Sequence, residues 1–360
     1  MPGNKVRAFL MSCVAIAAIS AWGCGATLGN KALTYEEPIT DPDIYVDIYN
    51  PDKTWQGTTL LADNHRPDRS RIIEVNMQGQ IVWKYDLPGH LKAYTNPGFD
   101  VKRLPSNNIL FLLPLKGVYE INRSGDVVWS YMDSKVSHDA DRLPNGNTLV
   151  VFGGQDTQND PQVKEIDSKG KIVWAWYAKD HFNKPPYRDI FNQGWTHTNA
   201  ASRFPNGSTL ISLRNFNLVV EVDPRGQVVR TIGEGILQEQ HDPEMLPQDH
   251  LLVANHQTPQ RAIEVDLNTG KIVWQSPGFE RDAAPVRDAN RLPNGNTLVT
   301  ASTRIVEFTP QNEIVWQLKL RNIDFRNQSD RPRLGFYKAE RITRHMATQP
   351  DVPPDRLCSR

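Results

Sequence analysis

The chain has 360 residues, of which 39% are hydrophobic and 23% are charged, and its 41 basic residues balance its 41 acidic residues. This composition is ordinary for a soluble globular protein, and the balanced charge gives no indication of a nucleic-acid partner. The length allows either two average domains or one large domain built from repeats.

The first 23 residues are predicted to be an export signal. Lys5 and Arg7 precede an apolar run over residues 8–22, which is shorter than the ~20 residues that a membrane span needs comfortably. The residues before Cys24 resemble a lipoprotein signal, in which Cys24 would be lipidated, although Trp22 departs from that pattern. Simple cleavage nearby is the alternative. We therefore expect an exported protein, periplasmic or lipid-anchored at the cell envelope, with membrane contact only through that anchor.

Residues 24–57 are expected to lead into the folded domain. Of the three cysteines, Cys13 lies in the predicted signal, and Cys24 and Cys358 lie at the two ends of the mature chain. A disulfide framework is therefore not expected to hold the fold together.

Internal repeats predict the fold of residues 58–342. The phrase Arg-Leu-Pro-Asn-Gly-Asn-Thr-Leu-Val occurs unchanged at residues 142–150 and 291–299, and weaker copies begin at Arg103, Arg203 and Met245. Each unit also ends in a closing phrase, which in five units is a hydrophobic pair followed by tryptophan. The sixth copy, at residues 229–230, has no tryptophan at the end. The closing tryptophans are Trp83, Trp129, Trp174, Trp274 and Trp316.

Each unit contains four short apolar runs separated by turn residues. In the third unit the runs cover residues 136–143, 148–152, 163–166 and 172–176, with Pro-Asn-Gly and Ser-Lys-Gly turns between two of the pairs. Such turns suit antiparallel hairpins. Four strands per ~42 residues are typical of propeller blades. The sequence therefore predicts an all-β, six-bladed propeller with four antiparallel strands per blade.

The first blade leaves one question open. Its innermost strand comes either from residues 43–49 or from residues 335–342, and the second choice would close the ring by pairing the two ends of the domain. Residues 343–360 repeat Pro and Asp, and we expect them to be a disordered tail.

Equivalent positions of successive blades lie at equivalent radii, so the repeats assign residues to the central channel. Five residues before each Leu-Pro or Phe-Pro turn stand Phe99, His138, Asn199, His241 and Arg287. One residue later stand Asp100, Asp139, Ala200, Asp242 and Asp288. The repeated aspartates are interpreted as structural acceptors of backbone hydrogen bonds between blades. The variable polar column is predicted to carry function.

Two further residues are expected to lie near these channel-lining side chains. His197 lies two residues before Asn199, so strand alternation places it on the same side. Arg214 follows the second strand of the same blade, where a guanidinium suits an oxyanion such as sulfate, phosphate or carboxylate. The alternatives are satisfied structural histidines and a surface arginine in a loop. Trp195 is either a platform for an aromatic substrate or a core residue.

These residues are compatible with three chemistries. The first is an anion pocket in which one histidine acts as a nucleophile and the other cations stabilise the transferred group. The second is a metal site on His138, His197 and His241, as in a lyase or oxygenase. The third is a scaffold that binds a ligand or a protein without chemistry.

Four motifs resemble the bacterial arylsulfate sulfotransferase family over roughly residues 95–320. They are Ser137-His138-Asp139, His197-Thr198-Asn199, Ser212-Leu213-Arg214-Asn215 and Gln240-His241-Asp242. The chain resembles a short form, because it has no room for the additional N-terminal β-domain of the best-known members. A pair of cysteines within the body is also missing, so substrate identity is not inherited from the resemblance.

The resemblance implies a propeller enzyme that moves a sulfuryl group from an aryl sulfate to a phenolic acceptor, without a nucleotide donor or other cofactor. By position, His241 matches the nucleophile that forms a transient sulfohistidine. His138, His197 and Arg214 match residues that grip sulfate and assist the leaving phenolate, and Asn199 matches a substrate-binding residue. From its channel position, Arg287 is also expected to bind substrate.

Overall fold

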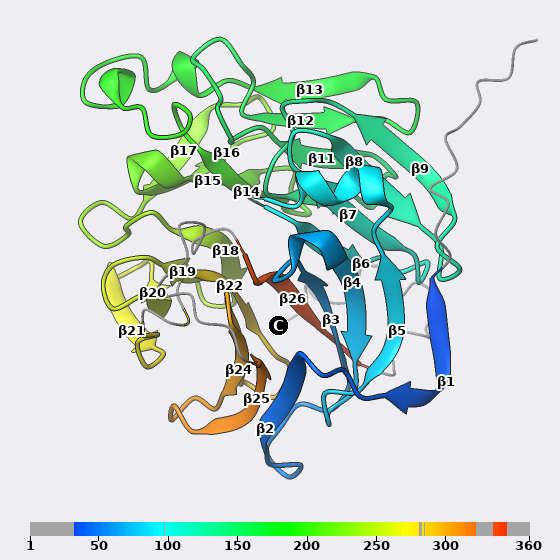
Figure 1. Cartoon of the computed structure of the whole chain (residues 1–360). Coiled ribbons are helices and arrows are strands. Elements are labelled where there is room, and N and C mark those ends of the chain that lie inside the picture. Colours follow the sequence, from blue (N-terminus) through cyan, green and yellow to red (C-terminus); the bar gives the residue numbers. More distant parts are fainter. Residues whose placement is uncertain (1–31, 97, 281–282, 284, 322–333, 344–360) are drawn as a thin grey trace, which may run out of the picture.

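The computed structural model describes residues 32–96, 98–280, 283, 285–321 and 334–343. The predicted signal, Cys24 and residues 344–360 lie outside this part of the chain. The described residues form six antiparallel sheets arranged in a ring (Figure 1). The predicted six-bladed all-β propeller is thus confirmed. Each blade has four antiparallel strands, and blades one and six each carry a fifth strand on the outer edge. No described helix is long and apolar enough to cross a membrane.

Blades two to five each follow the chain from the inner to the outer strand. Blade two contains β6 (Asp100–Arg103), β7 (Ile109–Leu113), β8 (Gly117–Ile121) and β9 (Val127–Met132). Blade three contains β10 (Ala140–Arg142), β11 (Thr148–Val151), β12 (Val163–Ile166) and β13 (Ile172–Trp176). Blade four contains β14 (Thr198–Arg203), β15 (Thr209–Leu213), β16 (Leu218–Val222) and β17 (Val228–Ile232). Blade five contains β18 (His241–Leu246), β19 (His250–Asn255), β20 (Arg261–Asp266) and β21 (Lys271–Gln275).

Blades one and six share the two ends of the domain. Blade one contains β3 (Thr58–Asp63), β4 (Arg71–Val75), β5 (Ile81–Asp86), the innermost strand β26 (Phe336–Ile342) and the outer strand β1 (Leu33–Ile39). Blade six contains β22 (Val286–Arg291), β23 (Thr297–Ala301), β24 (Arg304–Phe308), β25 (Ile314–Leu320) and the outer strand β2 (Ile44–Tyr49). Five short 3-10 helices occur in the described connections: η1 (Pro67–Arg69), η2 (Gly89–Tyr94), η3 (Ala178–Asp180), η4 (Tyr187–Asp189) and η5 (Arg214–Phe216).

Strand β26 answers the question that the sequence left open. It pairs with β3 as the innermost strand of blade one, so the C-terminal segment closes the ring. In Figure 1 this strand, in red, lies near the middle of the ring beside β3. The alternative segment instead forms β2 and pairs with β25 on the outer edge of blade six.

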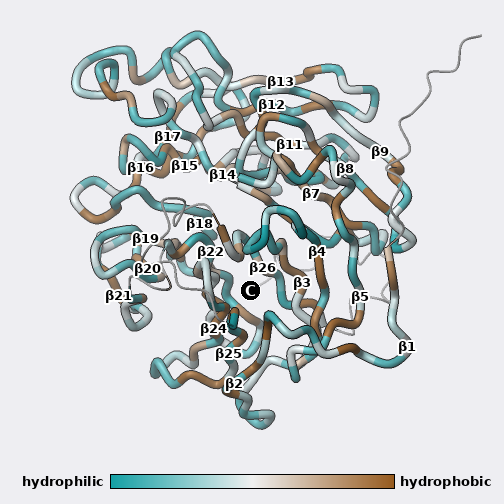
Figure 2. The backbone as a smooth tube through the Cα atoms, in the orientation of Figure 1, coloured by the Kyte–Doolittle hydropathy of each residue, from teal (hydrophilic) through white to brown (hydrophobic). Residues whose placement is uncertain are grey.

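Hydrophobic side chains fill the space between neighbouring blades. The described residues form six buried clusters, one at each blade–blade interface. In Figure 2 hydrophobic stretches follow the strands, whereas the turns are largely hydrophilic. The repeated tryptophans also link blades, because the indole Nε1 of Trp83 donates to Arg123 O at 2.9 Å and that of Trp316 donates to Met77 O at 2.9 Å.

The repeated aspartates confirm their predicted structural role in three blades. Asp100 accepts a hydrogen bond from Ala140 N at 3.1 Å, and Asp139 accepts one from Ala201 N at 2.8 Å. Asp288 accepts one from Ala339 N at 3.3 Å across the closure of the ring. In each case the acceptor lies on one blade and the donor on the next. These hydrogen bonds therefore fix the position of each innermost strand relative to that of the neighbouring blade.

Candidate active site

Irregular backbone at the start of the inner strands presents the channel side chains. His138 has a φ of +72°, and Asp139 N donates to Ser137 O at 2.9 Å across it. Therefore β10 begins at Ala140, four residues later than the predicted apolar run over residues 136–143. Register shifts also fall at Asn199 in β14, after His241 in β18 and at Arg287 in β22. The inner strand is thus irregular near this position in four blades, with a register shift in three of them. Such irregularities locally interrupt the strand pairing and redirect a side chain.

The structure brings the six predicted site residues into one cluster. The ring centroids of His138 and His197 are 4.8 Å apart. Asn199 Nδ2 donates at 2.8 Å to the carbonyl of Gln240, the residue before His241. Arg214 and Arg287 are close enough to lower the pKa of both His138 and His241 electrostatically. The cluster therefore combines three imidazoles, one amide and two guanidiniums.

Backbone carbonyls fix the tautomers of two of these histidines. His241 Nδ1 lies 2.9 Å from Glu239 O, and His197 Nδ1 lies 3.0 Å from Gln193 O. A carbonyl oxygen only accepts hydrogen bonds, so each Nδ1 carries the proton. The Nε2 atom of each neutral ring then keeps its lone pair, as a nucleophile or a proton acceptor requires.

Burial keeps the histidines neutral. It is the main reason that the pKa values of His138 and His241 lie well below the ordinary value, with nearby cationic groups adding to the effect. Burial and then Arg214 lower the pKa of His197 to about 4. Burial also lowers the pKa of Arg287 to about 10, so its guanidinium remains charged at pH 7. Neutral imidazoles beside cationic guanidiniums form a site that attracts an anion.

Three buried polar atoms in the cluster have no hydrogen-bond partner. They are His138 Nδ1, Asn199 Oδ1 and Arg287 Nη2. Buried polar groups are rarely left unpaired in the absence of a functional reason. The free guanidinium donor in particular suits an oxyanion. The metal alternative lacks geometric support, because the described residues contain no group of three or more His, Cys, Asp or Glu arranged to hold an ion.

Glu239 connects three parts of the site, and the sequence analysis missed it. Its carbonyl accepts the His241 hydrogen bond, whereas its carboxylate lies 2.7 Å from Arg214 Nη2 and 3.9 Å from His256 Nδ1. Its φ of +43° is unusual for a glutamate and marks a constrained turn. No repeat pattern singles out this position, since the residue lies in a connection between blades.

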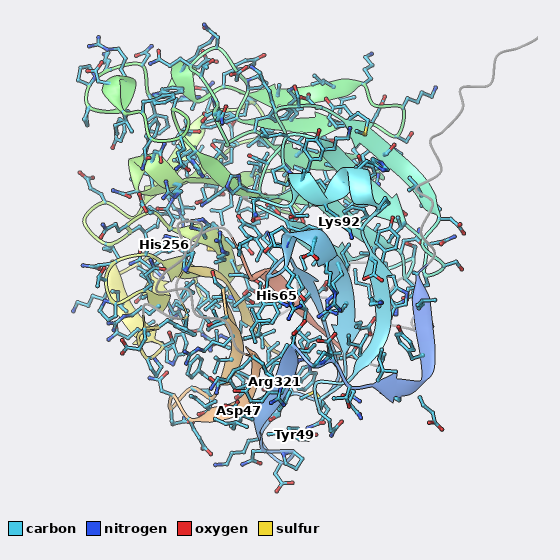
Figure 3. The ribbon with its side chains drawn as sticks, in the orientation of Figure 1. Asp47, Tyr49, His65, Lys92, His256 and Arg321 are labelled. Atoms are coloured by element: carbon cyan, nitrogen blue, oxygen red, sulfur yellow. The ribbon has the colours of Figure 1, made fainter. Side chains whose placement is uncertain are left out.

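His256 and Tyr337 are two further members of the cluster that were not predicted. The ring of His256 stacks on His241 with centroids 4.4 Å apart. His256, labelled in Figure 3, follows β19 at the blade-five position equivalent to Arg214. The Arg287 guanidinium lies 5.0 Å from the centre of the Tyr337 ring, which is 6.2 Å from that of His138. Tyr337 lies on β26, which reaches the site only through ring closure.

The loop before β14 is held by Asp156. Its carboxylate accepts hydrogen bonds from Thr196 N and His197 N, both at 3.1 Å. Trp195 in the same loop is buried, packs 5.4 Å from Phe216 and donates to Tyr187 O at 2.9 Å. Trp195 is therefore a core residue and not a platform for substrate.

A buried charge network fills the channel next to these residues. Lys338 Nζ on β26 lies 3.0 Å from carboxylate oxygens of Asp139 and Asp242 and 3.4 Å from Asp100. Asp242 directly follows His241, and its φ is +47°. Lys338 thus links β18, the strand that begins with His241, to the innermost strands of blades two and three.

Comparison with known proteins supports the resemblance. Residues 98–239 match the family model described as arylsulfotransferase (ASST). The match covers about two fifths of the chain, and this segment is similar to the arylsulfotransferase family. The matched segment includes His138, His197, Asn199 and Arg214, and it ends two residues before His241.

One solved structure supports the fold alone. A protein of unknown function from Bacteroides caccae is similar over 78% of this chain and 98% of its own, with 19% identity and a TM-score of 0.55. A catalytically inactive virginiamycin B lyase from Staphylococcus aureus, solved with quinupristin, aligns over 75% of this chain and 86% of its own, with 13% identity and a TM-score of 0.48. No curated protein matches the chain significantly.

Proposed function

We propose that the protein is an arylsulfate sulfotransferase, which moves a sulfuryl group from an aryl sulfate to a phenolic acceptor without a nucleotide donor. One observation carries the proposal. His241 presents an unprotonated Nε2, because its Nδ1 donates to Glu239 O, in a cluster with two guanidiniums. A neutral imidazole nitrogen is a competent nucleophile, and the guanidiniums stabilise an anionic group in transfer.

In the first step, the Nε2 lone pair of His241 attacks the sulfur of the aryl sulfate. The N–S bond forms as the S–O bond to the aryl group breaks, and the phenolate leaves with that electron pair. Arg214 and Arg287 bind the remaining sulfuryl oxygens, whose charge they partly neutralise. The product is a sulfohistidine and a phenolate that takes a proton from solvent.

In the second step, a phenol enters and its oxygen attacks the same sulfur. His197 Nε2 is free to accept the phenol proton, because its Nδ1 is committed to Gln193 O. The S–N bond breaks and returns the lone pair to His241, and His197 then releases the proton to solvent. One sulfuryl group is exchanged for one proton overall, so the route needs no cofactor.

The proposal also gives roles to the remaining residues. Asn199 Nδ2 donates to Gln240 O and so fixes the strand that begins at His241, while its buried Oδ1 has no hydrogen-bond partner and would accept one from substrate. The neutral His138 beside His197 is placed to assist the leaving oxygen. Export and lipidation at Cys24 are proposed from the sequence, and incorporation of a labelled fatty acid by the natural chain but not by Cys24→Ser would support lipidation.

The test uses the purified chain after the predicted signal, a chromogenic aryl sulfate and a phenol acceptor. We expect phenolate release that depends on the acceptor and disappears in His241→Ala. The matched control is His250→Ala, since His250 lies in the same blade but pairs with Glu264. An absence of release from folded protein across several donors would instead favour a propeller that only binds a ligand or a protein.

A further inference from the structure

A cavity of about 610 Å³ opens beside His138 and His197. Its lining includes Pro114, Leu115 and Phe191, and none of its lining residues is Asp, Glu, Lys or Arg. The volume lies within the range of small-molecule sites, which are mostly apolar with a few polar groups. The cavity thus differs from the charged cluster that it adjoins.

Two residues of the wall expose apolar surface. Leu115 is 42% exposed, and Phe191, on the connection between blades three and four, is 72% exposed. Leu115 also has a φ of +62°, which is costly for a leucine. A hydrogen bond from Leu115 N to Val136 O at 2.9 Å holds this conformation. An exposed and strained leucine beside a polar site is readily explained if its side chain meets a ligand.

The cavity wall is linked directly to the proposed catalytic machinery. Gln193 O accepts hydrogen bonds from both His197 Nδ1 and Gln155 N, each at 3.0 Å, and both glutamines line the cavity. The orientation of His197 therefore depends on the same backbone that shapes the wall.

Reaction geometry indicates what occupies the cavity. In an in-line displacement, the nucleophile and the leaving oxygen lie on opposite sides of sulfur. His138 and His197 line the cavity, whereas His241 does not. This arrangement favours a donor whose leaving oxygen is directed toward the cavity and whose aryl ring occupies it. The acceptor attacks along the same line in reverse, so it uses the same space.

Resting on the proposed function, we propose that this cavity binds the aryl group of both donor and acceptor, and selects uncharged phenols of two or three rings over charged phenols of one ring. The uncharged wall offers no counter-ion to a carboxylate or an ammonium group, whose desolvation is costly. An additional ring gains contact with Leu115 and Phe191. These two residues are therefore specificity determinants rather than catalytic residues.

The first test measures binding and does not require turnover. Calorimetry with His241→Ala protein compares 2-naphthol with tyramine, a charged phenol of one ring whose ammonium group cannot occupy the neighbouring oxyanion site. We expect 2-naphthol to bind at least about tenfold more tightly. Phe191→Asp should weaken naphthol binding by about tenfold, as for the loss of one apolar contact surface. Val229→Asp is the matched control, because Val229 is 59% exposed on the outer strand of blade four.

A second variant separates ligand contact from folding. Asparagine tolerates the left-handed backbone conformation better than leucine, so Leu115→Asn should preserve or raise stability in urea while lowering kcat/KM for 2-naphthol. Tighter binding of tyramine than of 2-naphthol would overturn the proposed selectivity. Turnover unaffected by both variants would overturn the cavity assignment and leave sulfuryl transfer intact. Naphthol binding that depends on Phe191, with no turnover of any donor, would overturn the proposed sulfuryl transfer but keep the assignment of this cavity as an aryl-binding site.

Discussion

Replacing His197 with glutamine should alter how the stability of the protein depends on pH. In the fold, burial and Arg214 lower the pKa of His197 from the ordinary 6.5 to about 4. The unfolded chain therefore takes up this proton first as the pH falls. Above pH 6.5 the residue is neutral in both states and carries no penalty, whereas between pH 6.5 and 4 the natural protein loses stability. Each pH unit corresponds to about 1.4 kcal/mol, so the total loss is on the order of 3 kcal/mol.

Urea unfolding of the natural protein and His197→Gln at pH 7 and pH 4 measures this loss. Other groups titrate in the same window, and some have the opposite sign. Asp100, for example, has its pKa raised to about 6, chiefly by burial. The informative quantity is therefore the stability difference between the two proteins at each pH. We expect it to shift in favour of the variant by on the order of 3 kcal/mol on going to pH 4. An equal difference at both pH values would refute the reasoning.

A spectroscopic control identifies the cause of the shift. Arg214 is the largest electrostatic contribution to the lowered pKa of His197, after burial. In Arg214→Gln, the His197 imidazole followed by NMR should titrate at a higher pH than in the natural protein. A pKa that stays at the natural value would show that the two side chains do not interact as the geometry indicates.

Two further predictions concern the framework of the site. Lys338→Met should destabilise the protein by roughly 3–5 kcal/mol in urea unfolding, because it leaves the buried Asp139 and the half-buried Asp242 without this cation. Adding Asp242→Asn should recover part of the loss. Gly153→Ala should lower both the melting temperature and the transfer rate, because an added Cβ would overlap Thr198 O in the inner strand of blade four. Gly89→Ala is the control: its Cβ would meet open space and its φ is not positive, so both quantities should be unchanged.

The repeats made much of the site predictable. Because each blade repeats the same turn, counting back five residues placed His138, His241 and Arg287 at equivalent radii without any knowledge of tertiary contacts. The structure confirms that these residues converge, and the next column, with Asp139 as an example, carries the hydrogen bonds between blades. Local sequence was sufficient here because the geometry is periodic.

The remaining parts of the site depend on features that are not periodic. Tyr337 and Lys338 reach the cluster only because β26 pairs with β3 at the other end of the domain. Glu239 lies in an irregular connection, where one backbone carbonyl and one carboxylate contact three different residues. The sequence also left Trp195 open between a core and a binding role, and only the packing against Phe216 decides it.

The central claim is that His241 carries the sulfuryl group, and trapping of the intermediate tests it most directly. The protein would be mixed with an aryl sulfate in the absence of acceptor, quenched in alkali to preserve an N-sulfonated imidazole, digested and analysed by mass spectrometry. The account predicts the added mass of one SO3 group on the peptide that contains His241. The adduct should persist in His250→Ala and be absent in His241→Ala. An adduct on His138 or His197 instead, or turnover with no adduct on any histidine, would contradict it.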